Sequence, residues 1–230
     1  MRRLALLCAL LWSCAAAAGP FGPTPGVTAR LGVPGLPSVA HSTWDTTLNT
    51  SYITYSNVNL TATWTTFQTG GAAARNTAVN SGTRCYFEIT PSTTVPAIGL
   101  ADSSYPTASG NIGADVHSLY YASGGSIYYN NGPQGSPGTW SAGAVVGFAI
   151  DFTLSPPQIW ARASPSSNWN GNASYSPNVG SQNGGIALSG ISTSLYIIAQ
   201  VGFSSGDAAT VNTGSSAYSG GLPTGFSSCW

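Results

Sequence analysis

The stretch AVVGFAIDF, residues 144–152, decides the fold class of this chain. Its residues are almost continuously apolar, and a short apolar run of this length is typical of a central strand in a β-sheet core. Asp151 is the one charged residue inside the run, and we expect its carboxylate to accept hydrogen bonds from a neighbouring turn. The stretch therefore predicts a core strand around which the remaining elements pack.

Short strand patterns recur on both sides of this stretch, separated by turns rich in Gly, Pro and Asn. Residues 84–90, RCYFEIT, alternate Cys85, Phe87 and Ile89 with residues of the opposite face, which is the period of a strand. No segment after the first 18 residues has the 3.6-residue apolar period of a helix. We therefore predict an all-β fold, an antiparallel β-sandwich or jelly roll. Its further strands are expected at residues 53–55, 60–64, 97–100, 118–121, 127–129, 158–161, 195–201 and 208–211.

The composition is poor in charge but rich enough in apolar residues to form a core. Charged residues make up 5% of the 230 residues, the chain contains no Lys, and Glu88 is its only Glu. Hydrophobic residues reach 42% and aromatic residues 11%, unlike a disordered chain. A net charge of +0 leaves no basic face to neutralise phosphates, which argues against nucleic acid as the main partner.

The N-terminus has the three parts of a signal peptide. Arg2 and Arg3 are followed by an apolar run at residues 4–12 and by small residues that end before Gly19. We expect residues 1–18 to be a signal peptide, with an uncleaved apolar arm that packs on a partner as the alternative. The sequence LWSC, ending at Cys14, also resembles a bacterial lipobox, so lipidation of Cys14 is a third interpretation.

The remaining organisation is a linker and one domain. Residues 19–40 are rich in Gly and Pro and predict an extended linker, so the folded domain should occupy residues 41–230. No segment reaches the roughly 20 apolar residues that a membrane-spanning helix needs. Export would leave Cys85 and Cys229 in an oxidising compartment, either as a disulfide or as two buried thiols.

Several motifs follow one another in a characteristic order. They are Trp44-Asp45, RCYFEIT at 84–90, IGLA at 98–101, HSLYYASGGSIYYNNG at 117–132, WSAGAVVGFAIDF at 140–152, QIW at 158–160, the insertion from Trp169-Asn170-Gly171 to Gly184-Gly185-Ile186, the strand pattern from Leu195 and PTGF at 223–226. This order resembles the SPRY (B30.2-like) domain, in the divergent form common in bacterial and phage proteins, and the resemblance covers about residues 41–230. Two departures affect turns, because Ala144 replaces an expected Asp and Ser155-Pro156-Pro157 stands where a Gly turn is usual.

This resemblance implies a bent β-sandwich related to concanavalin A-like jelly rolls. It implies recognition of proteins or glycans through loops at one end, usually without catalysis. Terminal strands lie near one another in such sandwiches, which favours close approach of Cys85 and Cys229. We therefore expect a non-catalytic binding module, exported or carried on a phage particle as part of a larger assembly. A lectin-like carbohydrate-binding domain is the alternative, and a divergent hydrolase is a more remote one.

The sequence offers no convincing catalytic or metal-binding pattern. Residues 202–206 fit G-x-S-x-G, but a strand pattern follows instead of a helix, and no His lies downstream. A retaining or inverting glycosidase needs two carboxylates, and no pair is indicated by spacing. His41 and His117 are isolated, and Cys-x-x-Cys is absent. We expect no cofactor and no metal.

The longest segment without strand pattern inside the domain is residues 163–185, and long loops of this kind are often functional. Its aromatic and amide side chains suit a polar, uncharged ligand, or a protein interface with aromatic anchors. The alternative for Trp169 is a core residue that plugs the end of the sandwich. The candidate ligand-binding residues are Trp169, Asn170, Asn172, Tyr175 and Asn183.

Overall fold

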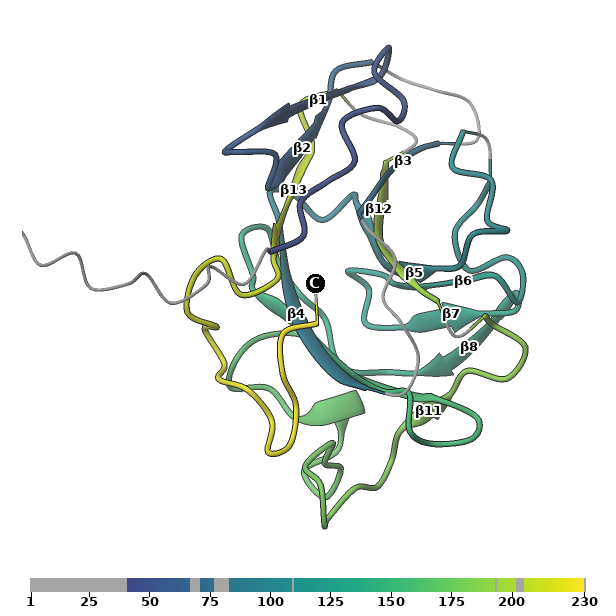
Figure 1. Ribbon diagram of the computed structural model, residues 1–230, viewed down its shortest axis with the longest axis vertical. Coiled ribbons are helices and arrows are strands. Elements are labelled where there is room, and N and C mark those ends of the chain that lie inside the picture. Colours follow the sequence, from purple (N-terminus) through teal and green to yellow (C-terminus); the bar gives the residue numbers. More distant parts are fainter. Residues whose placement is uncertain are drawn as a thin grey trace, which may run out of the picture. The chain divides into compact units, whose positions relative to one another are not determined.

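Two antiparallel β-sheets form the domain (Figure 1). The computed structural model describes residues 41–66, 71–76, 83–108, 110–192, 194–201 and 205–229. Within these ranges the only helical element is a single 3-10 turn, η1 (Trp169–Gly171). The predicted all-β antiparallel sandwich is confirmed. The expected signal peptide and linker lie outside the described residues.

One sheet has seven strands, and AVVGFAIDF supplies one of its interior members. All residues of β9 (Val146–Asp151) are buried. This strand pairs with β4 (Arg84–Pro91) on one side and with β10 (Gln158–Arg162) on the other. Each neighbouring pair in this sheet is antiparallel. The order is β1 (Ile53–Ser56), β2 (Thr61–Trp64), β13 (Ala208–Asn212), β4 (Arg84–Pro91), β9 (Val146–Asp151), β10 (Gln158–Arg162) and β11 (Ile186–Ala187).

The second sheet has six strands and is also antiparallel throughout. Figure 1 shows it facing the seven-stranded sheet across the interior of the domain. A tight turn at Asn130 and Asn131, both at positive φ, joins its last two strands. The order is β3 (Ala72–Arg75), β12 (Tyr196–Val201), β5 (Ala97–Ala101), β6 (Ser118–Tyr121), β7 (Ile127–Tyr129) and β8 (Gly132–Gly135).

Every strand that the sequence predicts is present, and three others form without a strand-like sequence. β3 is AAAR, β8 is GPQG and β11 has two residues. Alanine, glycine and proline have low β-propensity, so tertiary pairing determines these strands. All three lie at sheet edges, where proline in particular is tolerated because one side of the strand makes no ladder.

The core lies between the sheets and follows the period-two alternation of the strands. Phe87 of β4 and Phe148 of β9 pair in the register and stack with ring centroids 4.9 Å apart. Trp44 and Trp64 are fully buried at the β1–β2 end, and each indole N–H donates to a main-chain carbonyl. Burying one such side chain contributes roughly 1.5–3 kcal/mol, so these aromatic residues are principal contributors to stability.

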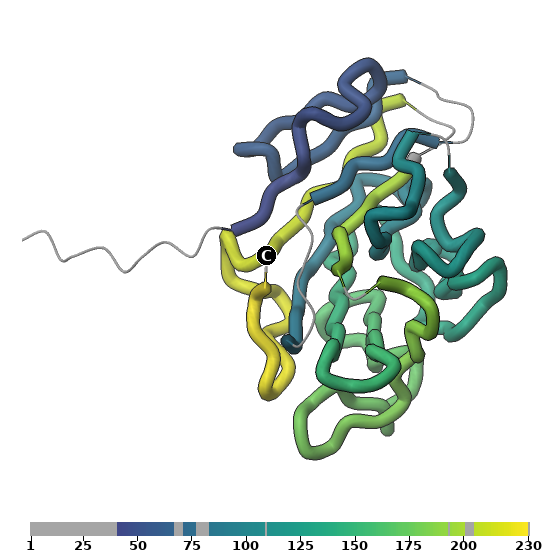
Figure 2. The backbone as a smooth tube through the Cα atoms, turned by 45° about the vertical axis from the view of Figure 1, so that its right-hand side comes forward, coloured from purple at the N-terminus to yellow at the C-terminus, as the bar shows by residue number. Residues whose placement is uncertain are grey.

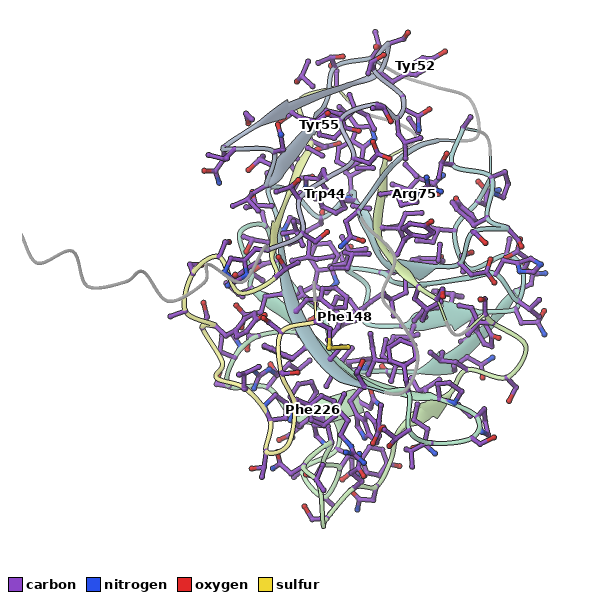
Figure 3. The ribbon with its side chains drawn as sticks, in the orientation of Figure 1. Trp44, Tyr52, Tyr55, Arg75, Phe148 and Phe226 are labelled. Carbon is purple, nitrogen blue, oxygen red and sulfur yellow. A yellow bond between two sulfur atoms is a disulfide. The ribbon has the colours of Figure 1, made fainter. Side chains whose placement is uncertain are left out.

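The seven-stranded sheet is covered on its outer face as well. Tyr86, Ala149 and Trp160 lie opposite one another in the register of β4, β9 and β10 and point away from the inter-sheet core. All three are nevertheless fully buried, and Phe226 packs against them with 7% of its surface exposed. Figure 3 labels Phe226 on the covering segment. Two loops, rather than a third sheet, therefore close this face.

The chain is joined covalently at one point. A disulfide links Cys85 of β4 to Cys229, with Cα atoms 5.2 Å apart, and appears as the yellow bond in Figure 3. Ser227 forms a parallel bridge with Cys85, so the C-terminal segment, residues 213–229, runs beside β4 (Figure 1, Figure 2). Among the described residues, no helix is long and apolar enough to cross a membrane.

Candidate functional site

Loop 163–185 lies against the C-terminal segment and completes the cover of the outer sheet face. The amide of Val179 donates to the carbonyl of Thr224, and the amide of Thr224 donates to Asn178 Oδ1. A Cβ on Gly225 would lie 2.5 Å from Val179 Cγ2, so glycine allows this close packing. The loop is therefore held along its length by contacts within the protein.

Asn170 anchors this loop to the edge of β10. Its side chain accepts from the amide of Ala161 at 2.9 Å and donates to the carbonyls of Ile159 and Gly184. It is 8% exposed and has φ 45°, a conformation that Asn tolerates better than most residues. The amide group thus continues the strand ladder beyond the short β11. Its hydrogen-bonding atoms are used inside the protein, so we do not retain Asn170 as a ligand contact.

Trp169 is half-buried over a buried cationic group. The guanidinium of Arg162 lies 4.5 Å from the centroid of the Trp169 ring, and Tyr86 meets the same ring edge-on at 6.3 Å. Trp169 therefore covers a cluster on the outer face of the seven-stranded sheet, and its role as an apolar ligand anchor stays a prediction.

That cluster contains the only Glu of the chain. Arg162 donates to the hydroxyl of Tyr86 at 2.7 Å, and this hydroxyl donates to Glu88 at 2.9 Å. The amides of Ser219 and Gly220 also donate to Glu88. Burial raises the pKa of Tyr86 well above its ordinary value, so its hydroxyl stays protonated and connects the two charges. The cluster fixes the C-terminal segment to β4.

The other predicted residues lie on the outer surface of the loop. Tyr175 is 36% exposed and rests on Gly184, where any Cβ would collide with the ring. The side-chain oxygen of Asn172 accepts from Ser174, and that of Asn183 accepts from Ser176. Both Asn side chains therefore shape local turns, which leaves Tyr175 as the predicted residue that presents a large ring to solvent.

A separate cavity of about 520 Å³ lies beside the edge strand β3, and we call it the Arg75 pocket. Trp44 and Asn76 pair as an isolated bridge there and form its buried floor. Figure 3 shows Trp44 and Arg75 at this end of the domain. The lining residues are Thr43, Trp44, Asp45, Thr46, Asn59, Arg75, Asn76 and Tyr196.

Arg75 is the chemically distinctive group of this pocket. Its guanidinium lies 4.2 Å from the centroid of Tyr196 and 4.0 Å from Asp45 Oδ2. It donates no hydrogen bond to any described residue, and its buried Nε lacks a partner there. Burial raises the pKa of Asp45, but hydrogen bonds from Thr47 and the charge of Arg75 outweigh burial and lower it. The pocket therefore presents a charged donor group whose described contacts are an ion pair at 4.0 Å and an aromatic ring, without a hydrogen bond to a described residue.

The sequence did not identify Arg75, because a lone Arg after three alanines has no motif. One signal was nevertheless available. Beyond residue 40 the chain has only three cationic residues of the Lys and Arg type, Arg75, Arg84 and Arg162. Arg84 forms an ion pair with Asp151 at 2.8 Å, and Arg162 is enclosed by aromatic rings. In so uncharged a chain, each Arg is worth testing for a partner.

The acidic side chains Asp102, Asp151 and Glu88 each contact a different, non-acidic partner and do not form carboxylate pairs with one another. Asp102 lies 3.0 Å from His117 Nδ1, Asp151 contacts Arg84, and Glu88 contacts Tyr86. Burial raises the pKa of Asp102, but hydrogen bonds from His117 and two main-chain amides outweigh burial and lower it. In the described part of the chain, no group of three or more His, Cys, Asp or Glu residues could hold a metal ion.

Comparisons of the sequence with protein-family models and with curated proteins find no match. Comparison of the structure does. The crystal structure of the TRIM65 PSpry domain superposes with a TM-score of 0.53 at 14% identity, covering 75% of this chain and 90% of that chain. The stonustoxin structure gives 0.51 at 14% identity, covering 75% of this chain and 27% of that chain. The sandwich therefore has the fold seen in SPRY domains.

Proposed function

We propose that this chain, with its SPRY-type fold, is a non-catalytic recognition module that binds a protein partner through the Arg75 pocket. The observation that carries the proposal is the guanidinium of Arg75, which makes no hydrogen bond to a described residue. Arginine offers five N–H donors in a fixed planar arrangement that matches carboxylates and carbonyls. A partner segment with an acidic side chain would satisfy donors that make no hydrogen bond to the described residues.

The surroundings of Arg75 favour a peptide side chain as the ligand. The pocket lies beside β3, the end strand of the six-stranded sheet, but Asp45 and Thr107 already pair with main-chain groups of β3, so a partner would enter by a side chain rather than as an added strand. Tyr196 supplies an aromatic surface beside the guanidinium, and Asn59 also lines the pocket. Asp45 balances the charge of Arg75 in the free protein at 4.0 Å, a distance at which an incoming carboxylate can compete.

The test is selection of binders from a random peptide library displayed on yeast. Peptides that bind the oxidised, folded protein should be enriched in Asp or Glu. Arg75→Gln should weaken them about tenfold or more, since a hydrogen bond to a charged group contributes about 1.5–3 kcal/mol.

The matched control is Arg84→Gln, which removes an Arg outside the pocket. It should leave peptide affinity unchanged once its melting temperature shows that the variant is folded. Failure to enrich any peptide, or equal binding by the Arg75 variant, would overturn the proposal.

Loop 163–185 is proposed as a second contact region of the same partner. Tyr175, Val179 and Leu222 are the exposed large apolar side chains on this loop and on the adjoining C-terminal segment. Aromatic and aliphatic anchors of this kind contribute strongly to protein interfaces. Tyr175→Ala should therefore weaken a full-length partner more than it weakens a short peptide bound in the Arg75 pocket.

We also propose that the protein is exported or carried on a virus particle. The order of charged, apolar and small residues at positions 1–18 supports export, as does a disulfide of a kind that persists in oxidising compartments. N-terminal sequencing of natively produced protein should begin near Gly19. A mature chain starting at Met1 would refute cleavage, lipidated Cys14 would select the lipoprotein alternative, and co-purification with particles would select the virion.

A further inference from the structure

The outer face of the six-stranded sheet carries a second cavity, which shares no residue with the Arg75 pocket. We call it the Tyr120 pocket. Its volume is about 470 Å³, within the range of small-molecule sites. The lining residues are Gly71, Val95, Ala97, Asn111, Ile112, Gly113, Ala114, Tyr120, Tyr128, Asn131 and Gln200.

Two tyrosines form an aromatic wall of this pocket. Tyr120 of β6 and Tyr128 of β7 lie opposite each other in the register, with ring centroids 5.0 Å apart and planes within 14°. Both side chains are half-buried. On the other side of Tyr120 the register places Gly99 of β5, which has no side chain to cover the ring. The two rings therefore form an aromatic surface on this face of the sheet, where they line the pocket.

Glycine lets a second segment pack against this wall. A Cβ on Gly113 would lie 2.5 Å from Tyr120 Cδ1, so residues 111–114 can approach the ring only because this position is glycine. The amide of Ile112 donates to Gln200 Oε1 at 3.0 Å, which fixes the same segment over the sheet. Residues 111–114 thus border the pocket beside the Tyr120 ring.

The polar groups of the pocket are all neutral at physiological pH. Asn111 is exposed and its side chain makes no hydrogen bond to a described residue, while Asn131 occupies the turn after β7. None of the lining residues is Asp, Glu, Lys, Arg or His. Without an ionic partner, a charged ligand would lose hydration here without compensation.

We infer that the Tyr120 pocket binds a neutral carbohydrate. The apolar C–H face of a pyranose packs on an aromatic ring, and its hydroxyl groups pair with amides, which matches a wall of tyrosines bordered by Asn111 and Asn131. The two rings are nearly parallel and stack on each other, so they do not surround a cation from several sides as an aromatic cage does. This geometry disfavours a quaternary ammonium ligand. This activity is independent of peptide binding at Arg75.

The experiment is isothermal titration of the oxidised protein with neutral oligosaccharides, namely cellohexaose, maltohexaose, xylohexaose and mannohexaose. At least one should bind with a dissociation constant below 1 mM. Tyr120→Ala should weaken that binding tenfold or more, and Tyr128→Ala similarly, because each ring forms part of the aromatic wall.

A milder variant guards against misfolding. Asn111→Ala changes an exposed side chain and should weaken binding about threefold or more, whereas Asn168→Ala, an exposed Asn on a different loop that makes no side-chain cap bond, should have no effect. The inference is overturned if no oligosaccharide binds, or if binding survives in folded Tyr120 and Asn111 variants. Saccharide binding that is lost in Arg75→Gln and kept in Tyr120→Ala would also overturn it and would assign the sugar to the Arg75 pocket.

Discussion

Replacing Asn170 by alanine should destabilise the protein far more than its position in a long loop suggests. The substitution removes one accepted and two donated hydrogen bonds to Ala161, Ile159 and Gly184. Each contributes about 1 kcal/mol, and the unpaired amide of Ala161 adds desolvation cost. The residue also has φ 45°, where alanine costs about 1–2 kcal/mol more than glycine. We expect a loss of about 3–5 kcal/mol in the free energy of unfolding.

Urea and thermal unfolding of the oxidised protein measure this loss. For a chain of this size it corresponds to a fall of about 10 °C in melting temperature. Asn170→Gly should recover about 1 kcal/mol, because it removes only the hydrogen bonds and not the backbone preference. Asn168→Ala, an exposed Asn in the same loop that makes no side-chain cap bond, should change stability by less than about 0.5 kcal/mol. If Asn170→Ala were as mild as Asn168→Ala, the anchoring of the loop to β10 would be refuted.

Three further predictions concern other parts of the domain. Val58 is 85% exposed at φ 53° in the β1–β2 turn, so Val58→Gly should raise the free energy of unfolding by about 1 kcal/mol in urea titrations, and an unchanged value would contradict the strain. Protein made in an oxidising compartment should show no reactive thiol from Cys85 or Cys229 under denaturing, non-reducing conditions, whereas two reactive thiols would reject the bond. The hydrogen bond that His117 donates to Asp102 raises the pKa of His117 above 6.5, so the stabilising contribution of this bond is complete below pH 6.5 and is lost as the pH rises through the raised pKa. NMR titration should show the pKa of His117 returning toward 6.5 in Asp102→Asn.

Strand patterns could be predicted from sequence because alternation and apolar runs record which face of a strand is buried. RCYFEIT shows this, since Cys85, Phe87 and Ile89 all enter the core. β3 could not be predicted, because AAAR acquires its strand conformation from pairing with β12. Such pairing depends on residues more than a hundred positions away, which no local pattern encodes.

The functional residues were harder to predict than the fold. Asn170 was selected because amides in loops often bind ligands, but a positive φ and a neighbouring strand edge give the same residue an internal role. Arg75 has no distinguishing motif, and Tyr120 belongs to a motif, residues 117–132, that indicates a strand pair and not a pocket. Their significance comes from neighbours on other strands, Tyr196 for Arg75 and Tyr128 for Tyr120, which only the sheet order brings together.

The strand order also constrains how the chain folds. β13 lies between β2 and β4, and β12 lies between β3 and β5, so the last two strands each join elements made much earlier. Until they are synthesised, each sheet remains divided into two parts with unpaired edges. Folding dominated by such long-range pairing is slow. A polypeptide that stays unfolded until nearly all of it has emerged from the ribosome is well suited to crossing a membrane before it folds. Truncation anywhere before β12 should yield an aggregating fragment rather than a smaller domain.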